Sequence, residues 1–67
     1  MKIIVNGTPR EFHPEPVILD RVLSELGLNK PNTVCLVNDE VVPPERYVAS
    51  RLTESDRLDL LAFVGGG

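Results

Sequence analysis

This chain of 67 residues contains one short segment whose apolar residues recur at the spacing of an α-helix. Because one helix covers only one face of a sheet, and a chain of this length buries only about 60% of its unfolded surface, we expect one small domain. The rest of the chain then has to supply a single sheet that packs on the helix. Apolar residues at i, i+3, i+4 and i+7 mark the stripe: Leu19, Val22, Leu23 and Leu26.

The predicted helix has a clear end and no clear start. Gly27 suits the left-handed position after the last turn, and Leu28 can fold back as the hydrophobic contact of that motif. Pro14-Glu15-Pro16 breaks the chain before the apolar run over residues 17–26, and no Ser, Thr, Asp or Asn lies where an N-cap is expected. The sequence therefore predicts a helix that starts after Pro16 without a side-chain cap.

The first segment of the chain has the pattern of a β-hairpin. Residues 2–5 are rich in β-branched side chains, and Asn6-Gly7 is a strong hairpin signal because both positions tolerate positive φ. Residues 8–12 would return as the second strand. Pro9 has no N–H for a sheet ladder, so we expect this returning strand at the edge of the sheet.

The remaining segments give the order β-β-α-β-(β)-β and an α+β fold class. In chain order they are a strand over residues 33–37, a short strand at 41–42, an irregular segment or single helical turn at 45–51, a turn at 53–56 and a last strand over 58–64.

The strands over residues 33–37 and 58–64 are apolar on both faces. A sheet with one solvated face should instead alternate apolar and polar residues, and the chain has no second helix to cover the far face. Either a partner protein covers that face, or the loops between residues 38 and 55 fold over it. In the first case the candidate partner surface is Leu36, Leu61, Phe63 and Val64.

Charge and hydropathy exclude several function classes. The net charge is −3 and the pI is near 4.9, with no basic stripe, which argues against a nucleic-acid-binding protein. No run of 18 apolar residues is present, so no membrane span is expected. The start is too short for a signal peptide before Asn6-Gly7 interrupts it, so we expect a cytoplasmic location.

The single cysteine and single histidine leave no cofactor or metal cluster to propose. Cys35 and His13 are far apart in sequence, and one cysteine cannot form a disulfide framework or a four-cysteine site. Cys35 lies mid-strand among apolar residues, where a free cysteine behaves as a small hydrophobe. A reactive cysteine would need exposure and an electropositive setting.

Three glycines, Gly65, Gly66 and Gly67, follow the last apolar run without a polar cap. Glycine is costly to order and packs little, so a fold gains nothing from three of them after a strand. A carboxylate on Gly67 would be ionised at neutral pH, with a reference pKa of about 3.3–3.7, and could attack an activated phosphate. The alternative is an inert, frayed end.

The chain resembles the ubiquitin-like prokaryotic sulfur carriers, and within them the thiamine-biosynthesis carriers of the ThiS family. The matching stretches are Met1-Lys2-Ile3-Ile4-Val5-Asn6-Gly7, Val37-Asn38-Asp39-Glu40-Val41-Val42-Pro43 and Leu60-Leu61-Ala62-Phe63-Val64-Gly65-Gly66-Gly67. The resemblance implies a ubiquitin-like β-grasp domain over residues 1–64, with a mixed four- to five-stranded sheet and one main helix on one face. Residues 65–67 would form a flexible tail.

The resemblance also implies a co-substrate rather than an enzyme. An E1-like adenylyltransferase would adenylate the carboxylate of Gly67, with Gly65 and Gly66 as a narrow leash. A cysteine desulfurase or other sulfur donor would then displace AMP and leave a thiocarboxylate. A thiazole synthase would take up the sulfur.

One turn departs from the family pattern, and other functions stay open. The family commonly has Asp-Gly-Asp before the last strand, whereas this chain has Glu54-Ser55-Asp56 and lacks the glycine expected at positive φ. The alternatives are a molybdopterin-synthase-type small subunit or ubiquitin-like protein modifier, and a β-grasp binding module with an inert tail.

Overall fold

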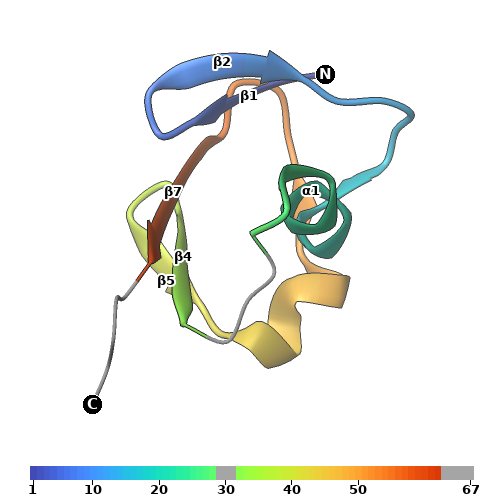
Figure 1. Cartoon of the computed structure of the whole chain (residues 1–67). Coiled ribbons are helices and arrows are strands. Elements are labelled where there is room, and N and C mark those ends of the chain that lie inside the picture. Colours follow the sequence, from blue (N-terminus) through green and yellow to red (C-terminus); the bar gives the residue numbers. More distant parts are fainter. Residues whose placement is uncertain (29–31, 63–67) are drawn as a thin grey trace.

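A mixed five-stranded sheet packs one face against a single α-helix, as Figure 1 shows. The structure is a computed structural model, and it describes residues 1–28 and 32–62. The strand order is β2-β1-β7-β4-β5, and a separate two-stranded sheet joins β3 to β6. The predicted α+β class is confirmed. The elements are β1 (Lys2–Val5), β2 (Thr8–Glu11), β3 (Val17–Ile18), α1 (Leu19–Leu26), β4 (Thr33–Val37), β5 (Glu40–Val42), the 3-10 helix η1 (Pro44–Ala49), β6 (Arg51–Leu52) and β7 (Arg57–Ala62).

The first hairpin forms as its sequence predicts. Asn6 and Gly7 have φ angles of 48° and 83°, so both turn positions are left-handed, as a type I′ turn requires. β2 is an edge strand, with Pro9 opposite Ile4. The missing N–H of Pro9 therefore costs no bond to a further strand.

The last strand, β7, lies in the middle of the sheet. It runs parallel to β1, with Val5 opposite Leu58, and antiparallel to β4, with Thr33 opposite Ala62. Beyond the end of β1, Asn6 continues the ladder: its N–H donates to the Leu58 carbonyl at 2.9 Å, and its Oδ1 accepts from the Leu60 N–H at 2.8 Å. Neighbours on both sides therefore hold β7 over residues 57–60, and β4 continues to pair with it through Ala62.

The helix begins at Leu19, two residues later than the apolar run suggests. Val17 and Ile18 instead form β3, which pairs antiparallel with β6, and the Leu19 N–H donates to the Ser50 carbonyl at 2.9 Å. The residue before the helix, Ile18, is extended and makes no side-chain cap bond, so the predicted uncapped start is confirmed. Pairing with a strand distant in sequence takes the place of the first helical turn.

The helix ends as predicted. Gly27 is left-handed with a φ of 70°, and its N–H donates to the Ser24 carbonyl at 3.1 Å. The Leu28 N–H donates to the Leu23 carbonyl at 2.8 Å, and Leu28 packs against the core. These two bonds are those of a Schellman motif with its hydrophobic contact.

The core is aliphatic except for one phenylalanine and the cysteine, and it fills the space between the sheet and α1. Half-buried Tyr47, from η1, packs against it. The buried core residues are Ile3, Val5, Phe12, Val17, Leu19, Val22, Leu23, Cys35, Leu52, Leu58 and Leu60.

The loops between residues 38 and 55 do not fold over the far face of the sheet. η1 and β6 lie on the helix side, where β6 pairs with β3 and the carbonyl of Ser50 accepts from the first residue of α1 (Figure 1). Leu61, on the far face, remains 54% exposed. Of the two arrangements that the sequence allowed, the described residues adopt the one that leaves this face open.

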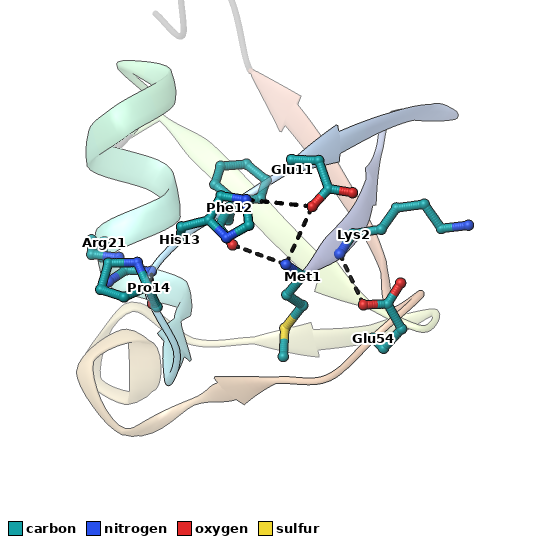
Figure 2. A network of polar contacts seen from close by, with 8 residues as sticks. All are labelled: Met1, Lys2, Glu11, Phe12, His13, Pro14, Arg21 and Glu54. Carbon is teal, nitrogen blue, oxygen red and sulfur yellow. Dashed lines mark hydrogen bonds and ion pairs between the residues drawn. The ribbon is translucent and has the colours of Figure 1, made fainter.

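Polar contacts join the start of the chain to the other segments, as Figure 2 shows. The Met1 ammonium lies 3.3 Å from Glu11 Oε2, and the Lys2 N–H donates to Glu54 Oε1 at 3.0 Å. Arg21 donates from Nη2 to the Pro14 carbonyl at 2.8 Å, which ties the proline segment to α1. The contacts of Met1 and Lys2 tie the start of β1, the parallel neighbour of β7, to β2 and to the turn before β7.

The turn before β7 keeps a left-handed residue although it lacks a glycine. Ser55 has a φ of 70°. Its N–H donates to the Lys2 carbonyl at 2.8 Å, so the turn is tied to β1. Partial burial raises the pKa of Asp56, but hydrogen bonds from the Thr53 N–H, the Asn38 amide and the Thr53 hydroxyl outweigh it and hold the pKa below its usual value.

Replacing Ser55 by glycine should stabilise the domain. The left-handed conformation costs a residue with a Cβ roughly 1–2 kcal/mol, and glycine avoids this strain. Glycine also loses more backbone entropy on folding, which offsets about 0.5–1 kcal/mol of the gain. We expect Ser55→Gly to raise the melting temperature by a few degrees, since about 1 kcal/mol corresponds to about 4–8 °C at this size. Ser55→Ala is the control, because it keeps the Cβ and should give no increase in a thermal melt.

Candidate functional site

The candidate site is the face of the sheet that α1 does not cover, next to the segment that leads to the C-terminus. Its apolar residues come from three neighbouring strands, and we call them the outer patch: Val34 and Leu36 of β4, Val41 of β5 and Leu61 of β7.

Strand register brings the outer patch together. Val34 lies opposite Leu61, and Leu36 lies opposite Val41. Cys35 and Leu60, the residues next to them along the strands, are buried on the helix side. Because successive side chains of a strand point to opposite faces, the patch residues share the outer face.

The outer patch is accessible to a partner protein. Val41 is 63% exposed and Leu61 is 54% exposed, while Val34 and Leu36 are half-buried. Leaving large apolar side chains in water is unfavourable by about 25 cal/mol for each Å². A contiguous exposed patch of this kind is typical of an interaction surface.

Charged groups border the patch. On β7, Arg57 and Asp59 share the outer face with Leu61, and Asp59 lies opposite Leu36. Arg57 donates from Nη2 to Asp39 Oδ2 at 2.7 Å, and its N–H donates to Asn38 Oδ1 at 3.0 Å. The rim is therefore polar and partly paired, which is the usual arrangement around the apolar centre of an interface.

Cys35 lies on the helix side of β4 and is fully buried. Burial raises the pKa of its thiol from 9.0 to about 11. This increase lowers the thiolate fraction at neutral pH about a hundredfold. The thiolate is the reactive form, so the structure gives Cys35 a packing role, as the sequence suggests.

A thiol reagent should therefore fail to label Cys35 in the folded protein. At pH 7.5 we expect labelling to be slow and to become fast in denaturant, as absorbance or mass spectrometry will measure. Fast labelling of the native protein would contradict the packing role.

Two of the predicted surface residues, Leu36 and Leu61, fall on the outer face. The other predicted site residues, Phe63, Val64, Gly65, Gly66 and Gly67, lie outside the described residues. The described part of the chain contains no group of three or more His, Cys, Asp or Glu that could hold a metal ion. Among the described residues, no helix is long and apolar enough to cross a membrane.

The sequence profile of the ThiS family matches residues 3–67. The chain belongs to the ThiS family. The crystal structure of the thiamine biosynthesis protein ThiS from Geobacter metallireducens superposes with a TM-score of 0.83, at 28% identity, over 100% of both chains. A solution structure of a thiamine biosynthesis protein from the same organism gives 0.77 at 31% identity, over 100% of this chain and 88% of the other. The predicted β-grasp fold is confirmed.

Two curated proteins are also similar to this ThiS-family chain. A thiazole synthase from Paramagnetospirillum magneticum is 33% identical over 67 residues, but the chain spans only 20% of that protein's length. The uncharacterized protein ycf40 of Pyropia yezoensis is 28% identical and is covered over 93% of its length. Family membership and the thiamine-biosynthesis structures support a sulfur-carrier role.

Sequence reasoning missed two members of the outer patch, Val34 and Val41. The alternation in residues 33–37 places Val34 on the same face as Leu36. The two-residue turn Asn38-Asp39 fixes Leu36 opposite Val41. Pairing the residues outward from that turn would have identified Val41 as the neighbour of Leu36 on the next strand.

Proposed function

We propose that this ThiS-family chain is a sulfur carrier whose terminal carboxylate, on Gly67, is converted to a thiocarboxylate for thiazole formation in thiamine biosynthesis. The observation that carries the proposal is the combination of a central strand, an open apolar face and a following glycine run. Such a domain offers a docking surface and, beyond it, a segment without side chains. The chemistry then belongs to the partner enzymes.

The proposed activation begins at the carboxylate of Gly67. An E1-like adenylyltransferase would join a carboxylate oxygen to the α-phosphorus of ATP and release pyrophosphate. A persulfide on the sulfur donor would attack the acyl carbon and AMP would leave. A thiol reductant would then cleave the S–S bond and leave the thiocarboxylate on Gly67. Residues 65 and 66 would serve as a leash, because glycine lacks a Cβ and passes through a narrow channel.

The similarity to a thiazole synthase supports the choice of pathway. A segment like this chain makes up a fifth of that protein, so a carrier-like domain and a thiazole synthase occur in one polypeptide there. Physical linkage of that kind favours a thiazole synthase as the acceptor of the sulfur here. We place the reaction in the cytoplasm, where a lone buried thiol such as Cys35 stays reduced.

Intact-mass spectrometry tests the proposal directly. The chain is incubated with the activating enzyme, ATP, a cysteine desulfurase with cysteine, and a thiol reductant, and the purified thiazole synthase is then added. Replacement of one oxygen by sulfur at the terminal carboxylate should add about 16 Da, because that group is the one activated. The gain should be lost again when the thiazole synthase and its substrates are present.

Two outcomes would favour the other functions. A mass gain that persists with thiazole synthase, but is discharged by a molybdopterin synthase large subunit or by transfer to protein lysines, would move the chain to another carrier pathway. No gain with an enzyme set that loads a known carrier would leave a binding module with an inert tail.

A further inference from the structure

The two edges of the five-stranded sheet are not equivalent. Each edge is the second strand of a hairpin with a two-residue turn, Asn6-Gly7 in one and Asn38-Asp39 in the other. The second residue of each returning strand lies at the same position relative to the turn. This residue is Pro9 in β2 and Val41 in β5. Proline has no N–H to offer, so it blunts the β2 edge. Val41 leaves the β5 edge open.

The backbone of Val41 faces outward from the sheet. In a two-residue hairpin the closing pair, here Val37 and Glu40, exchanges both N–H···O bonds, and the next pair does not. The N–H and carbonyl of Val41 therefore point away from β4. None of the hydrogen bonds among the described residues satisfies them. The N–H and the carbonyl of Val41 can therefore form hydrogen bonds with another strand.

An open depression of about 370 Å³ lies beside this edge, between β5 on one side and η1 and β6 on the other. Apolar residues such as Val42 and Leu52 line it, and Arg46 and Arg51 bring two guanidinium groups against the single carboxylate of Glu40. Within the described ranges, 1–28 and 32–62, neither arginine forms an ion pair. The depression is thus basic on a chain whose net charge is −3.

We propose that the β5 edge and this depression bind an extended acidic segment of a partner protein. The segment would add to the sheet by pairing its backbone with Val41, while its carboxylates meet Arg46 and Arg51. Apolar side chains at alternate positions would contact Val42 or the neighbouring outer patch, which Val41 joins to the depression. This binding requires no sulfur chemistry, so it stands or falls independently of the proposed function.

A short peptide with blocked ends, Glu-Val-Asp-Val-Glu, is the probe. Titrated into the isotope-labelled full chain, it should shift the amide signals of Val41 and of residues 46–51 and slow hydrogen exchange at the Val41 amide. Arg46→Glu and Arg51→Glu should each weaken binding about threefold to tenfold, since a reversed charge replaces attraction with repulsion. The matched control, Arg10→Glu on the β2 edge, should bind like the unchanged chain.

Val41→Pro tests the backbone contact. Because Val41 makes no ladder bond to β4, and Pro9 occupies the same place in the first hairpin, the variant should fold. It should bind the peptide about threefold to tenfold more weakly, as expected for one lost hydrogen bond. If its melting temperature falls, the two arginine variants decide the question alone.

Three results would overturn the proposal. The first is equal binding of a Lys-Val-Lys-Val-Lys peptide, and the second is binding that Arg46→Glu and Arg51→Glu leave unchanged. The third is a dimer of the free chain that Val41→Pro makes monomeric in sedimentation, since the occupant of the edge would then be a second copy.

Discussion

Deleting Gly67 should abolish adenylation of the chain and leave its melting temperature unchanged. The deletion leaves a carboxylate on Gly66 but shortens the leash by one residue, up to about 3.6 Å. A positioning error of about 1 Å can already cost two orders of magnitude in rate. Pyrophosphate release with the cognate activating enzyme measures the loss, and a thermal melt checks the fold.

Two controls test whether the length of the C-terminal tail causes the loss of adenylation. Adding one bulky residue after Gly67 should also abolish adenylation, because it would block the narrow channel of the proposed activating enzyme, whereas Ser55→Ala, distant in sequence, should be adenylated normally. Full activity of the shortened chain would show that the leash length is not matched to the enzyme. Loss of activity with a lowered melting temperature would show instead that the terminus supports the fold.

Replacing Leu61 by aspartate should weaken binding of the proposed activating enzyme about tenfold or more with little loss of stability. Leu61 is 54% exposed on the outer patch, opposite Val34. Exposed substitutions usually change the free energy of unfolding by about 0.5 kcal/mol or less. A charge placed in the centre of an apolar interface removes an anchor contact worth more than about 1 kcal/mol. Calorimetry of binding and a thermal melt measure the two effects.

Leu58 supplies the matched control on the same strand. It points to the helix side and is fully buried, so Leu58→Ala should cost roughly 2–5 kcal/mol. A domain of this length has only roughly 3–10 kcal/mol in total. The melting temperature should therefore fall by about 10 °C or more. If Leu61→Asp destabilised the chain as much, the outer patch would be part of the fold rather than an interface.

Local sequence was enough to predict the elements whose physical cause is local. The left-handed positions at Asn6, Gly7 and Gly27 follow from the residues themselves. The edge position of β2 follows from Pro9, which has no N–H to give to a further strand. The stripe of α1 follows from its helical spacing, so the helix face and the α+β class were predictable.

Elements that depend on pairing between distant segments were not predictable from local sequence. Val17 and Ile18 have side chains that suit either a helix or a strand. The bonds of β3 to β6, at Arg51 and Leu52, made them a strand. Ser55 is left-handed without being glycine, because its N–H reaches the Lys2 carbonyl.

The outer patch was likewise predictable in part from local sequence and in part only from the tertiary structure. Alternation along one strand indicated that Val34 and Leu36 share a face, but the register of β4 with β7 and β5 set Leu61 and Val41 beside them. The position of η1 and β6 on the helix side left that face uncovered. Sequence by itself determined the helical stripe, the turn at Asn6-Gly7, the helix end at Gly27 and the family. Tertiary structure alone decided which apolar residues stay in water, because exposure depends on what the whole chain packs against each face.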